Sequence, residues 1–370
     1  MNPTVSFIVP CYKLAHLLRE CVDSILAQTY TDFEVLIMDD CSPDNTPEVA
    51  QSFDDPRVKH IRNEPNLGHL RNYNKGIELS RGKYVWLISA DDVLRRNYVL
   101  ERYVEFLESH PTVGYVFCAG VGLENGRETV LLKDFWWGDQ DRIFKKREFL
   151  TKLLPRRGGI LSPSNMVRRE CYEKVSMFPV DMPHQGDLYL WCLWAFHYDV
   201  AYFTEPMVSY RFHDLNIMKA LKRTNHVIIV LDQLAVQWRI KRMATELGCS
   251  RVTKTWMSDV VELYVYCLVS KRFGSSPYHM SLDEFEKSLQ ENAGNRREKK
   301  RIRSRVYAGF GDGCYRYGDN EAALSYYHRA LREDVWMPVV WGKWALVRTG
   351  RAGQIARQGF AGLRRAVAAR

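Results

Sequence analysis

The sequence predicts an α/β fold with a mostly parallel central sheet, followed by an all-α region. Short apolar runs rich in β-branched residues alternate with amphipathic segments over residues 1–215. This alternation is typical of parallel strands joined by crossover helices. Two of the runs end in adjacent aspartates, and after about His213 the apolar periodicity becomes almost wholly helical.

The strands and helices of the first half follow in order along the chain. Strands are expected at residues 5–9, 33–38, 58–61, 84–88, 113–118 and 207–212. Helices are expected at residues 14–28, 46–53, 68–79, 95–109 and 186–196. Right-handed crossovers place the carboxyl ends of parallel strands at one edge of the sheet. Both aspartate pairs should therefore lie at this edge, where open α/β sheets bind their ligands.

The second half predicts a separate helical domain, so we expect domains at residues 1–215 and 216–370. Residues 225–247 and 252–272 have the periodicity of long amphipathic helices. Residues 307–330 resemble one tetratricopeptide repeat, which predicts a helical hairpin at about 305–335. Residues 351–370 predict a basic amphipathic helix that could contact anionic lipid or pack on the helical domain.

The composition indicates a soluble protein with reduced thiols. No segment reaches the roughly 20 consecutive apolar residues that a membrane span needs, and the first residues lack the features of a signal peptide. The nine cysteines are scattered and never form a Cys-x-x-Cys pair, which favours the cytoplasm over a disulfide framework or a zinc cage. The net charge of +9 suits anionic ligands or peripheral contact with the membrane. No nucleic-acid-binding motif is present.

Two pairs of acids are the first candidates for chemistry. Asp39 and Asp40 end one strand, where they could cap the next helix or accept hydrogen bonds from a nucleobase or ribose. Asp91 and Asp92 end another strand. Adjacent carboxylates are costly unless a cation lies between them, and carboxylate oxygens suit Mg²⁺ or Mn²⁺. We therefore expect a divalent cation at Asp92, where it would stabilise a departing diphosphate.

Three residues farther along the chain are further candidates. Asp187 begins an aromatic-rich helix, where it could cap the helix or act as the base for an acceptor hydroxyl. Arg211 and His213 end the last strand of the first half. A guanidinium suits a diphosphate, and a neutral imidazole is a good metal ligand.

Six segments, in order, resemble the signature blocks of family 2 glycosyltransferases. They are residues 5–12, 22–28 with 33–46, 66–68 with 71–72, 89–92, 186–187 and 210–213, and the similarity covers roughly residues 3–215. The resemblance implies a GT-A fold and inversion at the anomeric carbon. It also implies transfer of a sugar from a UDP- or dTDP-type donor to a hydroxyl of a glycan or lipid-linked acceptor, in bacterial surface polysaccharide assembly.

The resemblance also implies a role for each matching residue. Pro10, Tyr12 and Asp40 would line the base and ribose pocket, Arg71 would face the donor, and Asp91 would touch ribose or sugar. Asp92 would bind the metal, and His213 would approach the metal or diphosphate. Asp187 would be the catalytic base.

The chain departs from the family pattern at three positions and leaves other functions open. Asp187 is followed by Leu188 and is not part of the Glu-Asp pair that is commoner in the family. Ser89 stands where many relatives have an acid, and Cys41 where many have glycine. One alternative is a sugar nucleotidyltransferase, although residues 9–13 lack the glycine-rich loop usual in that class. Another is a non-catalytic scaffold with a relic sheet domain, although the acids at all three positions are intact.

Overall fold

The computed structural model describes residues 2–153, 159–213, 226–276 and 279–349. The chain divides into two compact units, which we describe separately. One contains Met1–Leu221 and Arg242–Val252, and the other contains Lys222–Lys241 and Thr253–Arg370. The first unit is α/β and the second is helical, which confirms the predicted fold class.

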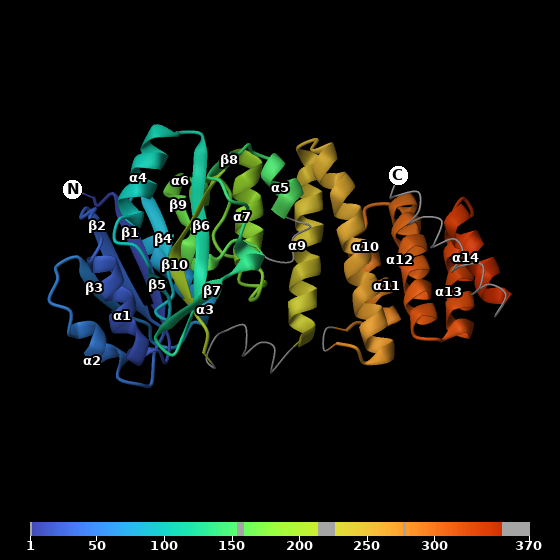
Figure 1. The fold of residues 1–370 in the computed structure, drawn as a ribbon, viewed down its shortest axis with the longest axis horizontal. Helices are drawn as coiled ribbons and strands as arrows, with labels where there is room; N and C mark the ends of the chain where they lie inside the picture. Colours follow the sequence, from blue (N-terminus) through green and yellow to red (C-terminus); the bar gives the residue numbers. More distant parts are fainter. Residues whose placement is uncertain (1, 154–158, 214–225, 277–278, 350–370) are drawn as a thin grey trace. The chain divides into compact units, whose positions relative to one another are not determined.

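The first unit is built on a ten-stranded mixed sheet (Figure 1). Its strands are β1 (Val5–Cys11), β2 (Phe33–Asp39), β3 (Val58–Arg62), β4 (Tyr84–Leu87), β5 (Val93–Leu94), β6 (Val113–Glu124), β7 (Arg127–Leu131), β8 (Arg142–Phe144), β9 (Met166–Arg168) and β10 (Asp199–Arg211). The order is β3-β2-β1-β4-β9-β6-β10-β5, with β7 on β6 and β8 on β10. Strands β3, β2, β1 and β4 are mutually parallel, as are β6 and β10, whereas β9 runs antiparallel between these two groups.

The helices of this unit cover the sheet because alternate strand residues point to opposite faces. They are α1 (Ala15–Leu26), α2 (Thr46–Gln51), α3 (His69–Leu79), α4 (Val99–Ser109), α5 (Glu148–Leu153), α6 (Arg169–Lys174) and α7 (Gly186–His197). Phe7 and Val9 of β1 share a core with α1 and α4, whereas Ile8 faces α3. A Cβ at Gly76 of α3 would lie 2.6 Å from Ile8 Cγ2, so glycine permits this close approach.

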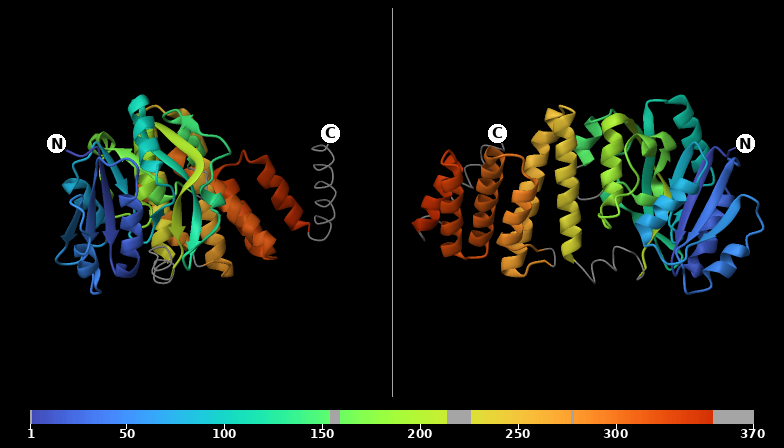
Figure 2. Two further views of the ribbon diagram at one scale, coloured as in Figure 1. Left: turned by 60° about the vertical axis from the view of Figure 1, so that its left-hand side comes forward. Right: turned by 180° about the vertical axis from the view of Figure 1, so that it is seen from behind.

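The second unit consists of helices with a core of their own. They are α9 (His226–Glu246, which ends in the first unit), α10 (Ser250–Phe273), α11 (Leu282–Asn292), α12 (Arg296–Arg316), α13 (Asn320–Glu333) and α14 (Pro338–Arg348). Helices α12, α13 and α14 lie side by side (Figure 2), and α12 with α13 covers the segment expected to form a hairpin. The basic tail at 351–370 lies outside the described residues. Within the described part of the chain, every helix is too short or too polar to cross a membrane.

Candidate active site

A cavity of about 360 Å³ lies in the first unit at the carboxyl ends of β1, β2 and β4. The first turn of α7 and the amino-terminal half of α3 complete its wall. Six of the nine predicted site residues line it: Pro10, Tyr12, Asp40, Asp91, Asp92 and Asp187. Arg71, Arg211 and His213 are not in the lining. Carboxylates far apart in the sequence therefore meet in one cleft.

Asp40 is buried, and its carboxylate organises the loop that precedes α3. Oδ1 accepts hydrogen bonds from Asn63 Nδ2 at 2.9 Å and from the Leu67 N–H at 2.8 Å. Oδ2 accepts the Gly68 N–H at 2.9 Å. These bonds fix the backbone that enters α3. Asp40 therefore has a structural role in this loop. Its direct contact with a nucleobase stays a prediction.

Asp39, its neighbour, lies outside the cavity lining and anchors the loop that follows β2. Its carboxylate accepts the Ser42 N–H at 2.8 Å and a bond from Arg62 Nη1 at 2.5 Å. Burial alone would raise the pKa of Asp39, but hydrogen bonds from Ser42, Arg62 and His60 outweigh it and lower the pKa. Asp39 is thus a charged structural group, and only the second acid of this pair reaches the cleft.

Asp91 and Asp92 are bound to the end of β10. The Arg211 N–H donates to Asp92 Oδ1 at 3.1 Å, and Arg211 Nε donates to the Asp91 carbonyl at 2.9 Å. His213 Nε2 lies 2.7 Å from Asp91 Oδ2. The guanidinium of Arg211 also contacts Glu20 Oε2 at 2.6 Å. Arg211 and His213 therefore hold the acid pair from outside the cavity, and their predicted contacts with diphosphate and metal stay predictions.

The Asp92 carboxylate is in an environment that disfavours its charge. Burial raises the pKa of Asp92 well above its usual range, and the negative charge of Asp91 raises it further. A cation beside the pair would offset both effects. Within the described residues, however, no three His, Cys, Asp or Glu side chains are already arranged to hold a metal ion.

Asp187 lies in the first turn of α7, on the wall of the cavity. Its Oδ1 accepts the Leu188 N–H at 2.7 Å. Burial raises the pKa of Asp187 to about 6, although this hydrogen bond opposes the rise. A carboxylate with a raised pKa holds a proton more readily than an ordinary aspartate, and this suits a general base.

Comparisons with known proteins place part of this chain in a family. The profile of "Glycosyl transferase family 2" matches residues 6–175. Residues 6–175 belong to this family. Among the relatives is glycosyltransferase GlyG of Streptococcus pneumoniae, 33% identical over 30% of this chain and 38% of that protein. Another is the putative teichuronic acid biosynthesis glycosyltransferase TuaG of Bacillus subtilis, 34% identical over 29% of this chain and 42% of that protein. This chain therefore spans less than half the length of these two relatives.

A solved structure supports the fold over nearly the whole chain. Staphylococcus aureus TarS, residues 1–349, superposes with a TM-score of 0.57 over 97% of this chain and 92% of that one, at 16% identity. The same protein has also been crystallised with UDP and with UDP-GlcNAc. At this identity the likeness concerns the fold alone, and it confirms the GT-A expectation for the sheet unit.

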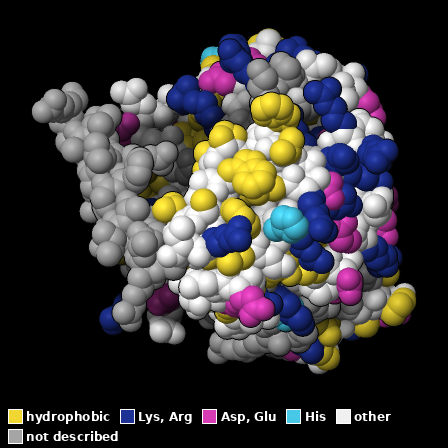
Figure 3. Space-filling view, turned by 90° about the vertical axis from the view of Figure 1, so that its right-hand side faces the viewer, with side chains coloured by type: hydrophobic (Ala, Val, Ile, Leu, Met, Phe, Trp, Pro, Cys, Tyr) yellow, Lys and Arg dark blue, Asp and Glu magenta, His cyan; other side chains and the backbone are white. Residues whose placement is uncertain are grey.

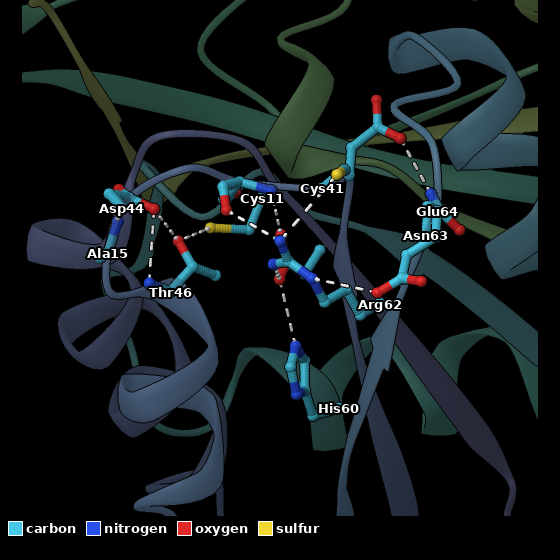
Figure 4. A network of polar contacts seen from close by, with 12 residues as sticks. Cys11, Ala15, Cys41, Asp44, Thr46, His60, Arg62, Asn63 and Glu64 are labelled. Carbon is cyan, nitrogen blue, oxygen red and sulfur yellow. Dashed lines mark hydrogen bonds and ion pairs between the residues drawn. The ribbon is translucent and has the colours of Figure 1, made fainter.

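The loop after β2 has a left-handed backbone at Cys41, where the resemblance to family 2 glycosyltransferases led us to expect glycine. Cys41 has φ of 58°, between the acid pair and Ser42. Left-handed backbone is unfavourable for residues with a Cβ. Arg62 reaches across this loop, with Nη2 3.9 Å from Cys41 Sγ and 3.1 Å from the Ser42 carbonyl (Figure 4). The loop conformation is thus maintained by its contacts without the usual glycine.

Arg71 lies on the side of α3 that faces away from the cleft. Residues 69, 70, 72 and 73 line the cavity, and at 100° per residue Arg71 falls on the opposite side of the helix. It is exposed to solvent. The structure does not bring Arg71 to the cavity, and its contact with the donor stays a prediction.

Sequence reasoning missed several residues that line the cavity. His69, Tyr73 and Phe178 line the cavity, and His69 Nε2 lies 2.8 Å from the Pro183 carbonyl. That contact joins α3 to the segment before the catalytic candidate Asp187. A helix that starts at the carboxyl edge of the sheet directs one of its sides at the cleft. The expected start of a helix at residue 68 could therefore have indicated that residues of its first turns line the cavity.

Proposed function

We propose that this protein is an inverting glycosyltransferase that uses a nucleotide diphosphate sugar of UDP or dTDP type. The acceptor is a hydroxyl of a glycan or lipid-linked saccharide, and the role is polysaccharide assembly. One observation carries the proposal, which is the convergence of Asp40, Asp92 and Asp187 on a single cavity at the carboxyl edge of the sheet. The UDP complexes of TarS support the donor class, and the name of TuaG supports the kind of product.

The residues present fit a divalent cation. Two adjacent carboxylates lie in the cavity, and the charge of Asp92 is disfavoured by burial and by Asp91. Mg²⁺ is commonly held by one or two carboxylates together with the phosphates of the substrate, so a complete protein cage is unnecessary. Asp92 would hold Mn²⁺ or Mg²⁺, with His213 beside the pair. When bound, the ion would neutralise charge on the leaving diphosphate.

The chain's own groups divide the remaining work. Asp187 accepts the proton of the acceptor hydroxyl as that oxygen attacks the anomeric carbon, which leads to inversion in one displacement. Its Oδ1 is occupied by the Leu188 N–H, so we assign the proton to Oδ2. Arg211 and His213 position the acid pair. Asp40 fixes the loop at the start of α3, where Pro10 and Tyr12 complete the pocket for the base and ribose.

We further propose a cytoplasmic location with peripheral membrane contact through residues 351–370. All nine cysteines are free, and eight of them are buried, as expected for reduced thiols. The tail carries arginine and no acidic residue, which suits attraction to anionic lipid.

The decisive experiment compares two variants with a panel of nucleotide sugars. We expect Asp187→Asn to keep donor binding by calorimetry and to lower kcat by at least about 100-fold, because the base is lost while the shape is kept. Asp92→Ala should lose the Mn²⁺-dependent part of donor binding. Near-normal turnover in Asp187→Asn would remove the base assignment. Release of pyrophosphate from a nucleoside triphosphate would instead indicate a nucleotidyltransferase.

A further inference from the structure

A basic hollow in the helical unit has no part in the function proposed above. Its volume is about 440 Å³, and α11, α12 and α13 provide its walls. The lining consists of Gln290, Arg296, Lys299, Lys300, Arg303 and Glu333. The four cations stand at positions i, i+3, i+4 and i+7 of α12, so they share one side of that helix over roughly 10 Å.

The positive charge of the basic hollow is only partly balanced. Arg303 donates to Glu286 at 2.9 and 2.7 Å and lies 3.5 Å from Glu333. Lys299 donates to Gln290 Oε1 at 2.6 Å, a neutral partner. Arg296 and Lys300 are exposed. Among the residues that the structure describes, neither of these two forms an ion pair.

Such an arrangement costs stability unless an anion is present. Like charges four residues apart on a helix repel each other, and both Arg296 with Lys300 and Lys299 with Arg303 are such pairs. Arg296 and Lys299 also lie in the first turn of α12, where the helix dipole is itself positive and disfavours cations.

We propose that the basic hollow binds a ligand that carries at least two phosphate groups. The four cations extend over roughly 10 Å of α12, which is long enough to contact more than one phosphate group. Lysine and arginine are the side chains that bind phosphate best. The lining contains no aromatic side chain on which a nucleobase could stack. The phosphates could belong to a soluble anionic chain or to lipid headgroups, and the experiment separates these sources.

The test compares two double variants of the full chain that remove the same charge. Arg296→Gln/Lys300→Gln removes two cations from the hollow, and Arg297→Gln/Arg301→Gln removes two exposed cations from the same helix outside it. Binding of inorganic tripolyphosphate is measured by calorimetry at low ionic strength. We expect the hollow variant to bind about 10-fold more weakly and the control variant to stay near the native affinity, because only the first loses direct charge contacts.

The second arm uses flotation with phosphatidylcholine vesicles with and without phosphatidylglycerol. A loss confined to tripolyphosphate assigns the hollow to a soluble anionic chain, and a loss confined to the anionic vesicles assigns it to headgroups. Equal behaviour of the two double variants in both arms would overturn the proposal, because the net charge alone would then explain binding. Circular dichroism of both variants checks that α12 is intact. Neither outcome depends on transferase activity.

Discussion

Asp187 combines a position on the cavity wall with a pKa raised to about 6 by burial. A general base must be deprotonated to work, so its activity should follow the deprotonated fraction of this carboxyl. We expect kcat/KM to rise from about pH 5 to about pH 7 with a midpoint near 6, measured at saturating metal. A rate that stays flat over this range would mean that another group accepts the proton.

The same shift makes a prediction about stability. The pKa of Asp187 rises from 3.8 to about 6 on folding, so the native state binds its proton more tightly than the unfolded chain. The buried charge of Asp187 therefore lowers the free energy of unfolding above pH 6. Below pH 3.8 the carboxyl is protonated in both states and has no such effect. Asp187→Asn should stabilise the protein by about 1–2 kcal/mol at pH 8 and by almost nothing near pH 3.8. Thermal melts at both pH values measure this, and a loss of stability at pH 8 would contradict it.

Cys41 has a left-handed backbone that glycine adopts without penalty. We expect Cys41→Gly to raise the free energy of unfolding by about 0.5–1 kcal/mol, because relief of strain exceeds the added entropy of the unfolded chain. Cys41→Val is the matched control, since a β-branched residue should lower stability at the same position. Urea titrations report both. If the two variants were equally destabilised, packing of the thiol rather than backbone strain would dominate.

At the scale of elements, Glu34 joins several segments of the parallel part of the sheet. Its carboxylate accepts bonds from Ser6 of β1 at 2.8 Å, Lys59 of β3 at 2.9 Å and Arg81 at 2.9 Å. Burial alone would raise the pKa of Glu34, but these hydrogen bonds lower it from 4.5 to about 2. The depressed pKa means that the carboxylate stabilises the fold above pH 4.5 and that this contribution is lost as the pH falls toward 2.

We therefore expect Glu34→Gln to destabilise the protein by about 1–3 kcal/mol at pH 7. The difference from the native protein should shrink steadily below pH 4.5. Glu108→Gln is the control, because Glu108 is half exposed in its ion pair with Lys83 and should cost under about 0.5 kcal/mol. Urea titrations across this pH range test both variants. A cost for Glu34→Gln that did not vary with pH would exclude charge as its source.

The elements with a strong local pattern were predictable, and the others depend on long-range pairing. Residues 5–9 and 33–38 have runs of apolar residues, and β1 and β2 are found there. Strand β9 has only three residues, yet it lies between β4 and β6. A segment so short has no periodicity, and only its partners define it. The mixed character of the sheet could therefore not be read from the sequence.

The candidate site was predictable as a set of positions and less so as a set of contacts. Because parallel strands end at one edge, Asp40 and Asp92 could be placed in a common cleft from their sequence positions. The backbone bonds of Asp40 and the outward face of Arg71 depend on how α3 is oriented. The orientation includes the close packing of Gly76 against Ile8, which no local pattern encodes.

At the scale of the whole molecule, charge and exposed apolar side chains both favour contact with a surface. The net charge is +9, and no acidic residue follows Asp334. Val335, Trp336, Val339 and Trp341 are exposed, Trp336 to 88%. Hydrophobic side chains gather beside lysine and arginine on the face drawn in Figure 3. Tryptophan and basic residues together are typical of proteins that bind at the membrane interface.

This combination leads to a prediction for the full chain. We expect it to float with vesicles that contain phosphatidylglycerol and a chain truncated after Gly350 to float less, because each basic residue of the tail adds about 1 kcal/mol of attraction near an anionic surface. High salt should weaken flotation of the full chain more than that of the truncated chain, because the attraction that the truncation removes is electrostatic. Trp336→Ser in the full chain measures the apolar contribution to flotation. The loss of flotation that this substitution causes should not change with the salt concentration. Equal flotation of full and truncated chains would exclude the tail as the membrane contact and leave the exposed tryptophans and the basic hollow of α12 as its remaining candidates.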